Sequence, residues 1–170
     1  MKTVELERTY LAKFLPNNLK NGKEVLDIYI PKFARHPVLR IRKNGDKFEI
    51  TKKYPVKNGD ASKQTEHTII LTEEEFDELS KLEGKRTSKI RYVINYNGIL
   101  CEIDVFQGAL KGLVLIDFEF SSEKDKDEFK MPDFCLVDVT QEEFLAGGML
   151  CGKSYDDIKE KLEKFGYKKL

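Results

Sequence analysis

The sequence has few of the residues from which soft metal centres and disulfide frameworks are built. Its 170 residues include two histidines, three cysteines and no tryptophan. The three cysteines, Cys101, Cys135 and Cys151, are odd in number and far apart, so they show neither a disulfide framework nor the spacing of a Cys-x-x-Cys metal site. We therefore expect a protein of a reducing compartment, the cytoplasm.

Net charge and long apolar runs are missing as well. The 30 Lys and Arg residues balance the 30 Asp and Glu residues, which argues against bulk electrostatic binding to nucleic acid or to an anionic membrane. No apolar run approaches the roughly 20 residues that a membrane helix needs, and no signal peptide precedes the first expected strand. We expect a single domain over residues 1–170, acting as a monomer or a homodimer without nucleic-acid or membrane partners.

Charged residues are abundant, at 35% of the chain, and they alternate with apolar residues as they would in β-strands. Near the N-terminus, Glu5, Glu7 and Thr9 alternate with aliphatic and aromatic residues. In a strand, both carboxylates would lie on one face, about 7 Å apart, with an apolar face behind them. This first stretch, residues 2–11, sets the pattern that the later strands repeat.

Seven further segments show similar alternation, and two hairpin signals, Asn44-Gly45 and Asn97-Gly98, join four of them. These segments are 25–30, 38–43, 47–53, 63–71, 85–96, 99–107 and 113–120. Helices are expected after Thr72, after Ser121 or Ser122, and over residues 155–165. The pattern predicts a mainly β, α+β chain with about eight antiparallel strands. Either a curled sheet leaves its charged face in water, or the sheet closes into a barrel whose lumen is the charged face.

The charges are sorted by sign from strand to strand. Acidic pairs occur at 5/7, 102/104 and 117/119, whereas basic pairs occur at 40/42 and 89/91. Like charges two residues apart on one strand repel each other unless something of opposite sign is bound. Carboxylates without His or Cys suit hard cations such as Mg²⁺ or Mn²⁺, and Arg and Lys suit phosphate oxygens. If the sheet closes into a barrel, the two sets would share one cavity and would describe a metal-assisted polyphosphate site.

In this order, the segments resemble the motifs of the CYTH, or triphosphate tunnel metalloenzyme, superfamily, which includes adenylate cyclases and thiamine triphosphatases. The resemblance covers most of the chain and implies an eight-stranded antiparallel tunnel that acts on triphosphates with a divalent metal. The matching stretches are Glu5-Leu6-Glu7-Arg8 for the ExExK signature, Leu39-Arg40-Ile41-Arg42-Lys43 for the double-arginine hairpin, Thr51-x-Lys53, Lys89-Ile90-Arg91, Glu102-x-Asp104 and Asp117-x-Glu119.

The resemblance also implies roles for individual residues. Glu5, Glu7 and Glu119 would hold the metal that grips the triphosphate, while Glu102, Asp104 and Asp117 would serve a second metal or orient the attacking water. The residues expected to carry the reaction most directly are Glu7, Lys53, Glu102 and Asp104. The substrate contacts are expected from Arg40, Arg42, Lys53, Lys89, Arg91 and Glu66.

The chain departs from the superfamily's motifs at three points. The signature lysine is Thr9, which carries no positive charge. The fifth strand, which commonly reads R-x-E-x-E, has Gln64 and Thr68 on either side of Glu66. No late arginine is evident, because Glu142-Glu143 stands in its place. These changes bear on the rate and on the natural substrate more than on the fold.

The expected reaction is in-line attack of water on a terminal phosphoryl group. No nucleoside-binding element is evident in the sequence, so inorganic triphosphate is the simplest substrate. Three alternatives remain: hydrolysis of nucleoside or thiamine triphosphate, cyclisation of ATP to cyclic AMP, and binding of polyphosphate without turnover.

Overall fold

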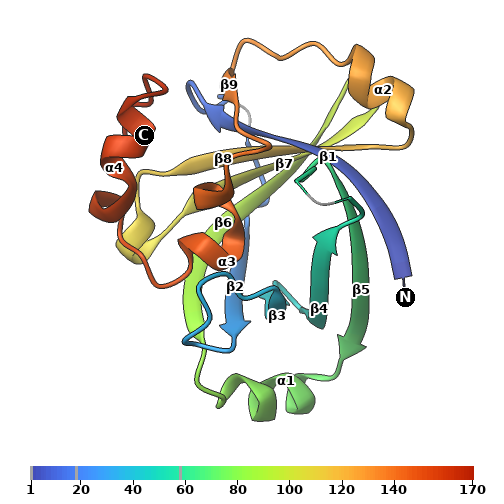
Figure 1. The fold of residues 1–170 in the computed structure, drawn as a ribbon, viewed down its shortest axis with the longest axis vertical. Helices are drawn as coiled ribbons and strands as arrows, with labels where there is room; N and C mark the ends of the chain where they lie inside the picture. Colours follow the sequence, from blue (N-terminus) through green and yellow to red (C-terminus); the bar gives the residue numbers. More distant parts are fainter. Residues whose placement is uncertain (1, 18, 58) are drawn as a thin grey trace.

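The computed structural model describes residues 2–17, 19–57 and 59–170, and its central feature is a closed antiparallel barrel (Figure 1). The barrel closes because β1 pairs with β8 along one edge and with β5 along the other. Its strands are β1 (Lys2–Ala12), β2 (Lys23–Ile30), β3 (Leu39–Asn44), β4 (Lys47–Pro55), β5 (Lys63–Leu71), β6 (Lys85–Tyr96), β7 (Ile99–Phe106) and β8 (Val114–Phe120). The eight-stranded antiparallel barrel expected from the sequence is confirmed.

A ninth strand and several short helices complete the fold. β9 (Cys135–Asp138) pairs with β1 at Tyr10–Ala12, beyond the stretch that β5 covers. The helices are α1 (Glu73–Ser80), α2 (Glu123–Glu128), α3 (Gly147–Leu150) and α4 (Tyr155–Glu163), with 3-10 turns η1 (Gly108–Leu110) and η2 (Glu143–Leu145). Within the described residues, no helix has the length and apolar character needed to cross a membrane.

The apolar outer face of the barrel is covered by these helices and by the chain around them. Phe76 of α1 packs on Ile28 and Ile41 at one side. Ile158 and Leu162 of α4 belong to a second cluster, which also contains Leu11 of β1 and Leu113, the residue just before β8. A third cluster, rich in aromatic rings, lies beneath the segment that includes α2. Because the apolar faces are buried on the outside, the charged faces of the strands point into the lumen.

The two hairpin signals behave differently in the structure. Asn97 and Gly98 form the two-residue turn between β6 and β7, with φ of 52° and 86°, as a type I′ turn requires. The turn between β3 and β4 is instead Gly45-Asp46, with a positive φ of 57° at Gly45. The expected Asn44-Gly45 turn is therefore displaced by one residue, and Asn44 is the last residue of β3.

Candidate active site

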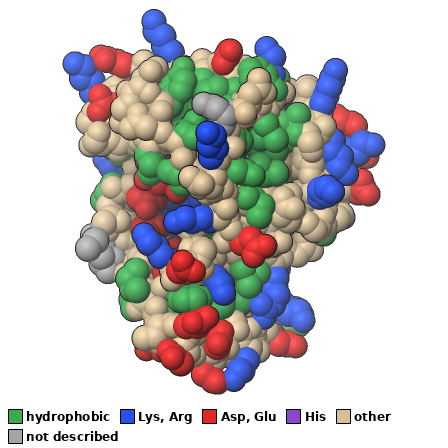
Figure 2. Space-filling view, turned by 180° about the vertical axis from the view of Figure 1, so that it is seen from behind, with side chains coloured by type: hydrophobic (Ala, Val, Ile, Leu, Met, Phe, Trp, Pro, Cys, Tyr) green, Lys and Arg blue, Asp and Glu red, His purple; other side chains and the backbone are tan. Residues whose placement is uncertain are grey.

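The lumen of the barrel holds a cavity of about 670 Å³. Side chains from all eight barrel strands line this cavity. Figure 2, which views the molecule from behind, shows acidic and basic side chains next to one another in a hollow of the surface. The structure brings together every site residue expected from the sequence. Those residues are Glu5, Glu7, Arg40, Arg42, Lys53, Glu66, Lys89, Arg91, Glu102, Asp104, Asp117 and Glu119.

An acidic wall is formed by β1, β7 and β8. The strand register places Glu7 opposite Glu119, and Glu102 opposite Asp117. Burial and the neighbouring carboxylates of Glu102 and Glu5 raise the pKa of Glu119 to about 7. Burial also raises the pKa of Glu7 and of Glu102. These carboxylates repel one another, so this wall favours a bound cation.

Lys53 of β4 crosses the lumen to the acidic wall. Its Nζ lies 2.6 Å from Glu5 Oε2 and 2.8 Å from Glu7 Oε2. Burial alone would lower the pKa of Lys53, but Glu7 and Glu5 raise it well above its ordinary value. Gln64 donates from Nε2 to the other oxygen of Glu7 at 2.9 Å, so the position expected to hold a base carries a neutral donor.

A basic wall is organised around Asp27, which the sequence analysis did not single out. Arg42 donates to both carboxylate oxygens of Asp27, at 2.6 and 2.9 Å. Arg40 Nε lies 3.7 Å and Lys89 Nζ 4.0 Å from the same carboxylate. Burial would raise the pKa of Asp27, but Arg42 and the other bases hold it far below its usual range. Asp27 is therefore the buried counter-ion of three cations.

Asp104 has the same function for the two bases of β6. Arg91 donates to both of its oxygens, each at 2.7 Å, and Lys89 donates to one of them. Burial opposes ionisation, but Lys89 and Arg91 hold the pKa of Asp104 at about 2. Arg91 also pairs with Glu102. Both carboxylate oxygens of Asp104 therefore accept hydrogen bonds from bases of the basic wall.

Thr9 points into the lumen, as the strand pattern predicts. Its hydroxyl donates to Asp117 Oδ1 at 2.6 Å. A lysine at this position would bring a charge as well as a donor, whereas threonine brings the hydrogen bond alone. The acidic wall therefore has one positively charged side chain fewer to balance its carboxylates, which strengthens its preference for a bound metal ion.

Among the residues that the structure describes, no three Asp, Glu, His or Cys side chains are already arranged to hold a metal ion. Several of these carboxylates already form ion pairs: Glu5 and Glu7 pair with Lys53, and Glu102 pairs with Arg91. Asp117 and Glu119 form no ion pair with any described residue. The possible metal ligands on this wall are all carboxylates, which are the ligands that hard divalent cations prefer.

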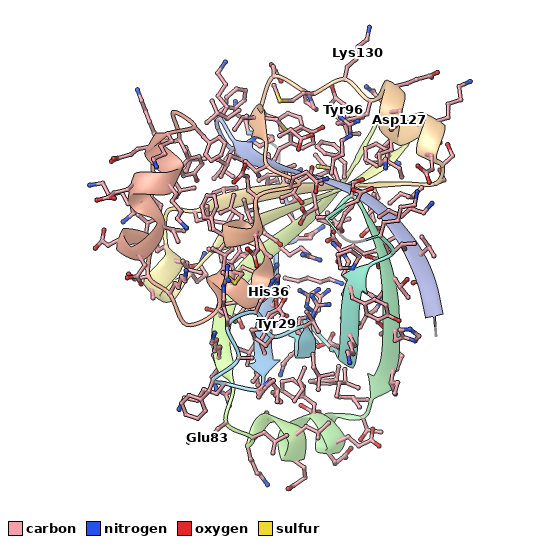
Figure 3. All side chains as sticks on the ribbon, viewed as in Figure 1. Tyr29, His36, Glu83, Tyr96, Asp127 and Lys130 are labelled. Carbon is pink, nitrogen blue, oxygen red and sulfur yellow. The ribbon has the colours of Figure 1, made fainter. Side chains whose placement is uncertain are left out.

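At one end of the cavity, α3 packs against β2 and against the loop between β2 and β3. A Cβ on Gly147 would lie 2.2 Å from the hydroxyl of Tyr29, and one on Gly148 would lie 2.1 Å from the carbonyl oxygen of Pro37. These two glycines, which the sequence pattern marks only as a bend, allow a close approach that any side chain would block. Tyr29 and His36, both labelled in Figure 3, line the cavity beside these two glycines.

The raised pKa of Glu119 leads to a stability prediction. Ionised Glu119 opposes folding between its ordinary pKa of 4.5 and its folded value of about 7, so stability is lost as the pH rises through this range. In EDTA, Glu119→Gln should raise the Tm at pH 8 and leave it nearly unchanged at pH 4.5, measured by thermal unfolding at both values. An equal Tm for both proteins at pH 8 would contradict the like-charge account of the acidic wall.

No family model matches the chain, but known proteins do. The inorganic triphosphatase of Nitrosomonas europaea is 31% identical over 140 residues, which are 81% of this chain and 90% of that protein. A solved structure of an inorganic triphosphatase superposes with a TM-score of 0.63 at 26% identity, covering 86% of this chain and 93% of its own. A putative adenylate cyclase from Bacillus halodurans matches with a TM-score of 0.57 at 18% identity, covering 99% of this chain and 93% of its own, a likeness of fold alone.

Proposed function

The chain belongs to the CYTH, or triphosphate tunnel metalloenzyme, superfamily, and from that premise we propose that it hydrolyses inorganic triphosphate with the help of a divalent cation. The observation that carries this proposal is the division of one cavity into a basic wall and an acidic wall. The basic wall matches the oxygens of a polyphosphate, and the acidic wall matches the metal that accompanies it. We further propose that residues 1–170 form one tunnel domain, and the three buried free cysteines fit the cytoplasm.

Arg40 is the base most available to a phosphate oxygen. Its side chain contacts Asp27 and Glu49 only at 3.7 and 3.6 Å, and its Nε is buried without a hydrogen bond to any described residue. Arg42, Lys89 and Arg91 are held by Asp27 and Asp104 and therefore keep their positions before substrate arrives. Bases fixed in this way stabilise developing negative charge without reorganising during the reaction.

Asp117, Glu119, Glu5 and Glu7 are the carboxylates that would hold Mg²⁺ or Mn²⁺. Such an ion neutralises phosphate oxygens and makes a bound water more acidic. Glu5 and Glu7 become available when Lys53 moves from them to a phosphate oxygen, an exchange of ion pairs within one lumen. Asp117 and Glu119 have no ion pair to give up within the described residues.

The chain's own residues then perform three tasks. The bases of β3, β4 and β6 bind and straighten the triphosphate. The carboxylates of β1, β7 and β8 orient the attacking water and accept its proton. The packing of α3 on Tyr29 and Pro37 takes up space at that end of the cavity and so leaves less room for bulk water there. Hydrolysis of the terminal phosphoanhydride releases orthophosphate and pyrophosphate.

A panel of substrates tests this proposal. Inorganic triphosphate, ATP, GTP and thiamine triphosphate should each be incubated with Mg²⁺ and with Mn²⁺, and orthophosphate, pyrophosphate and cyclic AMP measured. We expect inorganic triphosphate to give the highest kcat/KM and orthophosphate to be formed. Formation of cyclic AMP from ATP would establish cyclisation instead, and binding without any product would establish a polyphosphate-binding module.

A further inference from the structure

Gln64 lies near the start of β5, lines the cavity and contacts a carboxylate of the acidic wall. The strand register places it opposite Glu5 of β1, so Glu7 is a diagonal neighbour on the same face. A long side chain can reach across such a diagonal, and Gln64 Nε2 donates to Glu7 Oε1 at 2.9 Å. An amide therefore contacts Glu7 at the position where the sequence comparison led us to expect a base.

A second contact fixes the orientation of the Gln64 amide. The same Nε2 also donates to the carbonyl oxygen of Ala61 at 3.0 Å. Both partners of this nitrogen are acceptors, so turning the amide over would place its own carbonyl oxygen against two other oxygens. The two N–H groups of the amide are therefore both used, one for Glu7 and one for the chain just before β5.

The segment that holds the Gln64 amide is itself fixed by hydrogen bonds. The Ala61 N–H donates to Gln141 Oε1 at 3.0 Å, which ties this segment to the chain after β9. The Glu7 N–H donates to the carbonyl oxygen of Ser62 at 3.0 Å, which ties it to β1. Gln64 thus links a carboxylate of the lumen to a braced loop, and this link is present before any substrate binds.

The two oxygens of Glu7 have partners of different kinds. Lys53 Nζ donates to Oε2 at 2.8 Å, whereas Gln64 donates to Oε1. In the reaction proposed above, Lys53 moves to a phosphate oxygen, and Glu7 then keeps its hydrogen bond from Gln64. A neutral amide orients the carboxylate without offsetting its charge, whereas a cation in the same place would reduce the attraction for a metal ion.

We propose that Gln64 is a positioning residue, whose amide holds the Glu7 carboxylate in place for the divalent cation while Lys53 binds phosphate. The proposal rests on the function proposed above and adds to it a residue that acts through Glu7. A hydrogen-bond partner of a metal ligand orients that ligand, and its loss typically weakens metal binding by about 10–100-fold. Gln64 therefore sets the affinity for the metal ion rather than the affinity for triphosphate.

The test compares Gln64→Met, which removes the donor and keeps an unbranched side chain of similar length, with Gln107→Met. Gln107 is the matched control because it is also half-buried and its amide donates to the Val105 carbonyl oxygen, not to a carboxylate. In the absence of substrate, the calorimetric Kd for Mn²⁺ should rise by about 10–100-fold in Gln64→Met and stay at the wild-type value in Gln107→Met. The Kd for inorganic triphosphate in EDTA should stay at the wild-type value in both variants.

Gln64→Asn provides a second variant that keeps the polarity and the charge of the side chain and changes only its reach. Its amide is one carbon shorter and should not contact Glu7 and Ala61 together, so the Kd for Mn²⁺ should rise here as well. The Tm of each variant in EDTA shows that the protein is folded at the temperature of the titration.

An unchanged Kd for Mn²⁺ in both Gln64 variants would overturn the proposal. A Kd for triphosphate in EDTA that rises as much as the Kd for Mn²⁺ would also overturn it, because Gln64 would then be a substrate contact. So would a wild-type protein that binds no Mn²⁺, whatever its activity. A wild-type protein that binds Mn²⁺ without hydrolysing triphosphate would refute the proposed function and still test Gln64.

Discussion

Replacing Glu7 with glutamine should lower kcat/KM for inorganic triphosphate by at least about a hundredfold and leave the fold intact. Glu7 lies in the acidic wall, where Lys53 and Gln64 already contact its two oxygens. Glutamine keeps the size of the side chain but gives a metal ion a much poorer ligand. Losing part of the metal's electrostatic stabilisation costs several kcal/mol in the transition state, and each 1.4 kcal/mol is about tenfold in rate.

The fold should tolerate this change because Glu7 is one of several crowded carboxylates. Burial raises its pKa, as do the charges of Asp117 and Glu5, so the free protein gains from removing its charge. Lys53 retains Glu5 as a partner. Glu24→Gln is the matched control, since Glu24 is an exposed residue of β2. Wild-type kinetics in Glu7→Gln would show that Glu7 is not a metal ligand.

Replacing Asp27 with asparagine should lower the free energy of unfolding by about 3–5 kcal/mol, the usual effect of removing one partner from a buried ion pair. Asp27 is 2% exposed, and Arg42 donates two hydrogen bonds to it. Arg40 and Lys89 would also lose their nearest shared counter-ion. Urea unfolding at pH 7 measures the loss.

Two comparisons make the Asp27 result specific. Asp138→Asn breaks a more exposed pair, Arg8 with Asp138 at 3.7 Å, and should cost less than about 1 kcal/mol. Inorganic triphosphate should stabilise Asp27→Asn more than it stabilises the wild type, because bound phosphate replaces the missing counter-ion. Equal losses in the two variants, or no extra protection by triphosphate, would contradict the account of the basic wall.

The sequence predicted the strands and their inward faces well, because period-two alternation of charge and apolarity reports which side of a strand is buried. The segment 85–96 coincides with β6, and residues 2–11 with nearly all of β1. Alternation alone did not decide between an open sheet and a barrel. That choice depends on the pairing of β1 with β5, which joins residues about 60 positions apart, and only the family resemblance favoured it.

Other site residues were missed for identifiable reasons. Asp27 is a lone charge among the aliphatic residues of β2, without the like-charged partner that marked the other strands. Asn44 was assigned to the hairpin turn, so its inward side chain was overlooked. Gly147 and Gly148 follow no strand, and their close contacts come from residues more than 100 positions earlier. A sequence pattern reports local periodicity, whereas these roles depend on contacts made after the barrel closes.

The most direct measurement of the central claim is release of orthophosphate from inorganic triphosphate by the purified protein, with Mg²⁺ and again with excess EDTA. The acidic wall and its carboxylate ligands predict one orthophosphate and one pyrophosphate for each triphosphate consumed with Mg²⁺, and no turnover in EDTA. Undiminished activity in EDTA, or no orthophosphate above the protein-free control with Mg²⁺, would contradict a metal-dependent triphosphatase in this tunnel.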